Sequence, residues 1–224
     1  MDLQALALTL RLAVVTTALL LAIAVPLAAW IVFTRSRLRA LVEAVSTLPL
    51  LLPPTVLGFY LLVLLGPRTA LGRAWIHLTG HPLAFSFSGL VVGSAIYSLP
   101  FAVQPLVAGF AGVDTALLEQ ARLLGASRLR LLRQVLLPLS TRSVLTAAVL
   151  CFMHTVGEFG VVLMIGGNIP GATRTLSILI YDQVQDFAYA QANRTSLLLV
   201  AVSLAALVLL YSQRRPALGE ARRG

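Results

Sequence analysis

The chain has 224 residues, of which 58% are hydrophobic and only 11% charged, and its mean hydropathy is +0.92. Soluble domains are about 45–50% apolar and about 25% charged. A soluble fold of this length could not bury so much apolar surface. The composition therefore excludes a soluble domain and predicts an integral membrane protein.

All 17 basic residues are arginines, and the sequence contains no lysine. A phosphate-binding P-loop needs the lysine of its GxxxxGK[ST] motif, so this chain cannot carry a P-loop ATPase site. The net charge of +9 would suggest nucleic-acid binding in a soluble protein. Here the arginines lie mainly in short loops between apolar runs and indicate topology instead. We expect no nucleic-acid partner.

Five apolar segments are long enough to cross a membrane, which takes about 20 residues. In chain order they are residues 12–34 (or from Leu3), 45–65, 89–110, 143–166 and 194–211. The second segment carries Pro49, Pro53 and Pro54, each of which removes a backbone donor, so we expect a kinked or broken helix there. The single cysteine, Cys151, lies in an apolar run and is expected to be a buried structural thiol.

The arginines are distributed unevenly between the two sets of loops. Twelve fall on one side, at positions 35, 37, 39, 122, 128, 130, 133, 142, 214, 215, 222 and 223, and five on the other, at positions 11, 68, 73, 174 and 194. Because arginine-rich loops stay in the cytoplasm, the N-terminus is predicted outside and the C-terminus inside. The basic cluster follows the first span, which is typical of an uncleaved anchor rather than a signal peptide. We expect a multi-pass protein of the inner (cytoplasmic) membrane, forming one permease domain over residues 1–224.

The longest cytoplasmic segment, residues 111–142, has the pattern of a helix, a glycine and a second helix. Asp114 is a good N-cap for the first helix, and Gly125 suits its C-terminus. Ser127 can cap the second helix, which Pro138 ends or kinks. The hairpin is amphipathic. It could lie on the membrane surface or fit into a groove on a partner, and this pattern alone favours neither.

The same loop resembles the "EAA" signature of ABC importer permeases. Three residues separate Glu119-Gln120-Ala121 from Gly125, and nine further residues separate Gly125 from Val135-x-Leu137-Pro138. Gln120 replaces the middle alanine of the family pattern, and Val135 replaces isoleucine.

The resemblance implies an all-α permease of the type I ABC importer fold, with about five transmembrane helices and a coupling-helix hairpin. That hairpin would dock on a separate ATPase subunit, two of which would drive a homodimer of this chain. ATP and magnesium would then bind the partner, with no cofactor, metal or catalytic residue in this chain. The expected coupling residues are Asp114, Leu118, Glu119, Ala121, Arg122, Gly125, Ala126, Val135, Leu137 and Pro138.

Three further stretches, residues 48–58, 157–160 and 167–175, look like the molybdate-type permeases, with sulfate/thiosulfate and tungstate permeases as close alternatives. In such systems an extracytoplasmic oxyanion-binding protein docks on the outer face. The expected pathway or gate residues are Pro53, Pro54, Thr55, Gly157, Glu158, Phe159 and Gly160.

An ionisable residue inside a span is costly, so Glu158 is expected to act in gating or helix packing, with a water-facing helix end as the alternative. His154 lies one turn earlier and could pair with Glu158 or form an interhelical hydrogen bond. An intramembrane enzyme using these two residues would need a further catalytic group, and none is evident. A secondary transporter would tend to show internal repeats.

Overall fold

The computed structural model describes residues 2–212, and the predicted cytoplasmic arginines at positions 214, 215, 222 and 223 lie outside this part of the chain. The described chain is helical, which confirms the all-α fold class. Three helices are long and apolar enough to cross a membrane: α1 (Leu3–Phe33), α5 (Phe87–Ala111) and α12 (Tyr189–Ser212). Two bent helix pairs raise the number of candidate spans to as many as five.

The second predicted span is broken where its prolines predicted a kink or break. Helix α2 (Leu38–Leu51) ends just before Leu52, and α3 (Pro54–Leu64) begins after Pro53, with a bend of 113° between the two helices. Leu52 and Pro53 have extended ψ angles of 139° and 134°. Proline cannot donate a backbone hydrogen bond and disfavours helix in the residue before it, so two consecutive prolines stop the helix.

The fourth predicted span, residues 143–166, needs correction, because it is not one helix. Helix α9 (Thr141–Gly157) ends one residue before Glu158, whose backbone is extended, and α10 (Gly160–Gly166) is a separate short helix. At its N-terminal end, α9 is preceded by the helical segment Arg128–Leu139, and the two are related by an 82° bend. Gly157 and Gly160 flank the break, and glycine is a poor helix former.

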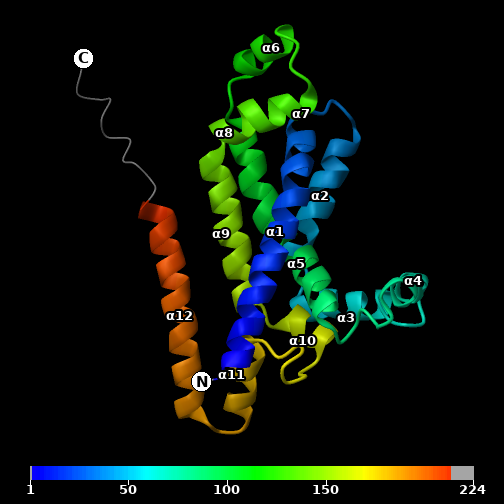
Figure 1. The fold of residues 1–224 in the computed structure, drawn as a ribbon, viewed down its shortest axis with the longest axis vertical. Helices are drawn as coiled ribbons and strands as arrows, with labels where there is room; N and C mark the ends of the chain where they lie inside the picture. Colours follow the sequence, from blue (N-terminus) through cyan, green and yellow to red (C-terminus); the bar gives the residue numbers. More distant parts are fainter. Residues whose placement is uncertain (1, 213–224) are drawn as a thin grey trace.

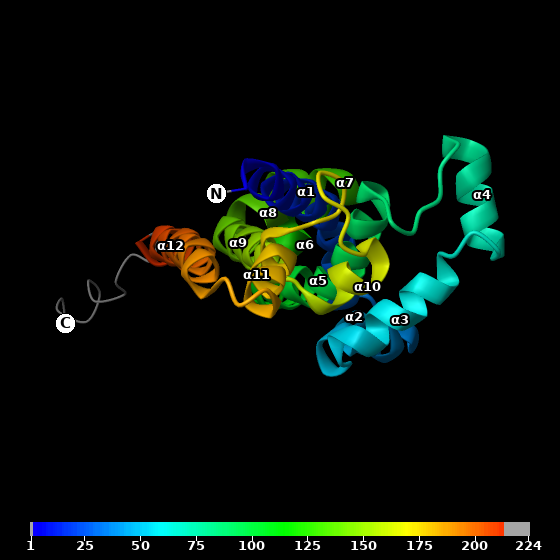
Figure 2. The same cartoon turned by 90° about the horizontal axis from the view of Figure 1, so that it is seen from below.

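The core lies where α1, α5 and α9 pack against one another. Ala24 and Ala28 of α1 are fully buried, as are Ala102 of α5 and Ala147 of α9. Small residues at such positions let helix backbones approach closely in a membrane. Cys151 belongs to the same cluster and is a buried free thiol, which confirms the expectation for it. Figure 2 shows α12 and α4 (Ala70–Thr79) on opposite flanks of this core.

The shorter elements gather at the two ends of the long helices (Figure 1). One end carries α6 (Thr115–Leu123), α7 (Arg128–Leu131), a π-helix (Leu132–Leu136) and α8 (Leu137–Leu139). The other end carries α3, α4, α10 and α11 (Leu176–Gln185). The start of α1 lies at this second end, so the N-terminus and the α6 hairpin are on opposite sides of the bundle.

Helix α10 packs against α3 through a position that has no room for a side chain. A Cβ atom at Gly160 would lie 2.7 Å from Cβ of Pro54, whereas a Cβ atom at Gly157 would meet nothing within 4 Å. Gly160 therefore permits the close approach of α10 to α3, whereas Gly157 has room for a side chain.

This difference predicts that Gly160→Ala destabilises the protein while Gly157→Ala does not. The added methyl group at position 160 must displace a rigid proline ring, and such overpacking costs about 1–3 kcal/mol. Thermal unfolding of the detergent-purified protein, followed by loss of the monodisperse size-exclusion peak, measures the effect. Equal unfolding temperatures for the two variants would show that the α3–α10 contact is not tight.

Candidate functional site: a docking hairpin and a carboxylate-lined cavity

Helix α6 is closed at both ends by local hydrogen bonds that its sequence predicts. The Asp114 carboxylate accepts a hydrogen bond from the backbone N–H of Ala116 at 2.9 Å, which confirms it as the N-cap. At the other end Gly125 has φ = 80°. The backbone N–H of Gly125 donates to the carbonyl of Arg122, and the backbone N–H of Ala126 donates to the carbonyl of Ala121. This pair of bonds is the Schellman motif, in which glycine adopts a left-handed conformation without strain.

The leucines of this hairpin point in two directions. Leu118 is 6% exposed and packs inward, whereas Leu117, Leu123 and Leu124 are 43%, 87% and 88% exposed. The leucines of this amphipathic hairpin therefore do not all face the bundle: Leu118 does, whereas the other three are open to the outside. Ala121 is half-buried, and Glu119 and Arg122 are exposed beside it. Helix α6 thus projects beyond the bundle with uncovered leucines at its C-terminal end (Figure 1).

The second half of the hairpin connects α6 to the core. The Ser127 hydroxyl caps α7 by accepting from the N–H of Arg130. Leu136 belongs to the buried cluster between α1, α5 and α9, and Leu137 packs against it, while Val135 is half-buried. Pro138 is exposed within α8, and the chain turns into α9 just after it, at Ser140. The last turns of the hairpin are thus anchored in the bundle.

At the opposite end, the two helix breaks border one cavity of about 520 Å³, which we call the carboxylate cavity. It is lined by Pro54, Thr55, Tyr97, Met153, His154, Gly157, Glu158, Phe159 and Gly160. The structure thus brings together all the predicted pathway residues except Pro53. Residues 54–55 and 157–160 are about a hundred positions apart in the chain and meet through the contact between Pro54 and Gly160.

Glu158 is 4% exposed, and both of its carboxyl oxygens are buried without a hydrogen-bond partner. The Ser94 hydroxyl of α5 lies beside it, but it too is buried and forms no hydrogen bond within 3.5 Å. A buried polar group normally has a partner, because leaving it unsatisfied costs about 1–3 kcal/mol. The Glu158 carboxyl group is thus buried at the wall of the cavity, with the Ser94 hydroxyl as its polar neighbour on α5.

His154 forms the interhelical hydrogen bond that was one of its two expected roles. Its Nδ1 lies 2.8 Å from the Ser98 hydroxyl of α5, and its ring stacks on Phe101 with the ring centroids 4.1 Å apart. Tyr97 packs against the same ring. Sequence reasoning missed Ser94, Tyr97 and Ser98, although polar residues four positions apart in an apolar span were a signal for them.

The glycine-rich stretch of residues 167–175 is held in place by side chains. The Asn168 amide donates to both carboxylate oxygens of Asp182, at 2.8 and 2.7 Å, and its own oxygen accepts from Nε of Arg174 at 2.6 Å. The same arginine lies 3.5 Å from the carboxylate of Asp182. This network joins the loop to α11. In the described part of the chain, no three histidine, cysteine or acidic side chains cluster to hold a metal ion.

Comparison with known proteins places these features in a family. Residues 8–215 match the family described as "Binding-protein-dependent transport system inner membrane component". The chain is 50% identical over 214 residues to the molybdenum transport system permease protein ModB of Azotobacter vinelandii, covering 96% of this chain and 95% of that protein. It is 36% identical over 175 residues to the molybdenum transport system permease protein ModB of Escherichia coli (strain K12), covering 78% and 76%.

The fold is also similar to a solved one. A chain in the crystal structure of a bacterial alginate ABC transporter in complex with alginate pentasaccharide-bound periplasmic protein superposes with a TM-score of 0.76. The sequence identity is 18%, and the match covers 95% of this chain and 78% of that chain. The chain therefore belongs to the family of binding-protein-dependent transport system inner membrane components, as a multi-pass membrane protein with the fold of an ABC importer permease.

Proposed function

We propose that this chain is the membrane-spanning subunit of an ATP-driven importer that carries molybdate. Two copies form the translocation pathway, and a separate ATPase subunit docks on the α6 hairpin of each copy. An extracytoplasmic binding protein delivers the oxyanion to the face that carries α3, α4, α10 and α11. The hairpin end then faces the cytoplasm, and the start of α1 lies outside.

The observation that carries the proposal is the exposed end of α6. Leu123 and Leu124 are 87% and 88% exposed at the tip of a helix that stands clear of the bundle. Exposed leucines flanked by Glu119 and Arg122 are typical of an amphipathic helix that enters a groove on a partner. The chain has no lysine for a P-loop, so ATP hydrolysis requires a separate subunit.

The carboxylate cavity supports the transport role. Broken helices in transporters occur where they line a cavity, because non-helical backbone cannot face lipid. The cavity offers few groups that could select an anion, and among the residues that line it are the Thr55 hydroxyl and the Tyr97 phenol. Selection among oxyanions is therefore assigned to the extracytoplasmic binding protein. The names of the two ModB relatives favour molybdate, and sulfate/thiosulfate or tungstate is the alternative cargo.

The proposed orientation predicts which loops a membrane-impermeant thiol reagent reaches in sealed cells. In a Cys151→Ser background, Tyr189→Cys, at a residue 60% exposed at the start of α12, should be labelled from outside. Leu123→Cys, at a residue 87% exposed on α6, should be labelled only after the cells are opened. Labelling of Leu123→Cys in intact cells would reverse the topology.

The docking role predicts that Gly125→Val abolishes substrate uptake without preventing membrane insertion. Valine at φ = 80° is strained by about 1–2 kcal/mol, so the end of α6 must change shape and its leucines are no longer aimed correctly. Less ATPase subunit should co-purify with this variant. Ala121→Asp should act similarly, by placing an unpaired charge in the docking groove.

The matched control for this experiment is Gly80→Val. Gly80 also has φ = 80°, ends a helix and has nothing within 4 Å of its Cβ position, but it lies on α4 at the other end of the bundle. The control should incur the same backbone strain and still bind the ATPase subunit. Wild-type uptake and ATPase association for Gly125→Val and Ala121→Asp would show that the hairpin lies on the membrane surface.

At the carboxylate cavity, Glu158→Gln should change the rate of transport but leave assembly and substrate choice intact. Glutamine keeps the shape of the side chain and removes its ability to carry negative charge. Uptake of radiolabelled molybdate into proteoliposomes, with excess sulfate or tungstate as competitor, measures both properties. Glu43→Gln, on the exposed face of α2, is the control. A changed order of competitors in Glu158→Gln would assign the residue to substrate selection instead of gating.

A further inference from the structure

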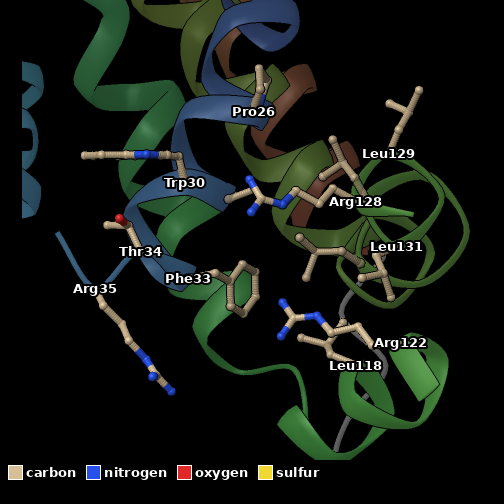
Figure 3. Close-up of a pocket in the computed structure, with 13 residues that line it drawn as sticks. Pro26, Trp30, Phe33, Thr34, Arg35, Leu118, Arg122, Arg128, Leu129 and Leu131 are labelled. Atoms are coloured by element: carbon tan, nitrogen blue, oxygen red, sulfur yellow. The ribbon is translucent and has the colours of Figure 1, made fainter. Parts of the chain in front are cut away.

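A second cavity, of about 600 Å³, opens at the hairpin end of the molecule (Figure 3). We call it the arginine cavity. One wall is the last turns of α1, with Pro26, Trp30 and Phe33, and the other is formed by α6, α7 and the π-helix. It is separate from the carboxylate cavity, with which it shares no lining residue.

Positive charge is concentrated in this cavity without compensation. Figure 3 shows the guanidinium groups of Arg122 and Arg128 directed into the space beside Phe33, with Arg35 at its edge and pointing away. No aspartate or glutamate lines the cavity. Within residues 2–212, the ion pairs involve only Arg39 and Arg174, so these three arginines have no acidic partner there.

Apart from Thr34, the rest of the wall is apolar, and it lies at the end of the long apolar helix α1. Helix α1 stops at Phe33, and Trp30, which is 40% exposed, sits one turn before that end. Tryptophan is enriched at the membrane–water interface, where its apolar ring contacts lipid. Leu129, Leu131 and Leu132 complete the apolar lining. The cavity thus offers cations to a headgroup and apolar side chains to the start of an acyl chain.

From this arrangement we propose that the arginine cavity binds the headgroup of an anionic phospholipid from the adjoining leaflet. Basic pockets between membrane helices recognise such headgroups. The remaining C-terminal residues of the chain are an unsuitable occupant, because residues 213–224 contain four arginines and one glutamate and would be repelled. Leu118 and Arg122 of α6 line the cavity, whereas the uncovered leucines at positions 123 and 124 do not.

The proposal is tested on the full chain in detergent, by native mass spectrometry during titration with phosphatidylglycerol. Arg128→Gln should weaken binding about fivefold, because one arginine contributes about 1 kcal/mol to attraction of an anionic lipid. The matched control is Arg130→Gln, in the same short helix but outside the cavity. Phosphatidylcholine should bind weakly to all forms, and inorganic phosphate at the same concentration should not displace phosphatidylglycerol.

Three results would overturn the inference. Equal phosphatidylglycerol binding by wild type, Arg128→Gln and Arg130→Gln would remove the cavity as the site. Displacement by inorganic phosphate would make it a site for free anions. Loss of the ATPase subunit from Arg128→Gln, with lipid binding unchanged, would make the cavity part of the protein interface.

A second variant covers failure of Arg128→Gln to fold. Leu129→Asp places a carboxylate on the same wall, at a residue 55% exposed, and should weaken phosphatidylglycerol binding in the same way. Which leaflet supplies the lipid rests on the proposed function and its topology. The binding measurement needs neither transport nor ATP, so it can fail or succeed independently of that function.

Discussion

The requirement that every backbone polar group inside the membrane be satisfied within the protein governs this structure. Two interruptions of the helices nevertheless occur, at residues 52–53 and at Glu158. They are placed against each other, since Pro54 and Gly160 are in contact and both border the carboxylate cavity. These two non-helical stretches thus lie where they line a cavity, whereas α1 runs through 31 residues as one helix.

The hairpin at the other end is connected to the core through short-range geometry. The Schellman motif at Gly125 sets the direction of α6, and the π-helix leads into Leu136, which is packed between α1, α5 and α9. A push on α6 would therefore reach the ends of three long helices through packed side chains. Rigid elements with packed ends can transmit such a displacement, whereas a flexible loop would absorb it.

Arginine serves distinct purposes along the chain because its guanidinium group stays charged in every environment. Near α11, Arg174 is neutralised by Asp182 and bonded to Asn168, which makes it structural. At the hairpin, Arg122 and Arg128 face a cavity that contains no acidic side chain. Arg174 is therefore paired within the fold, whereas Arg122 and Arg128 remain available to a ligand. A count of arginines in the loops cannot distinguish these two cases.

The sequence by itself determined the lipid environment, the all-α class and the internal design of the hairpin. These rest on signals local in the chain: long apolar runs, the Asp114 cap, the glycine at position 125 and the prolines at 53 and 54. Only the tertiary structure decided that the segment of residues 143–166 breaks at Glu158, and that Ser94 and Tyr97 of α5 adjoin that carboxyl group. It also decided which leucines of α6 are covered. These features depend on contacts between residues far apart in sequence, which the spacing of residue types along one segment does not encode.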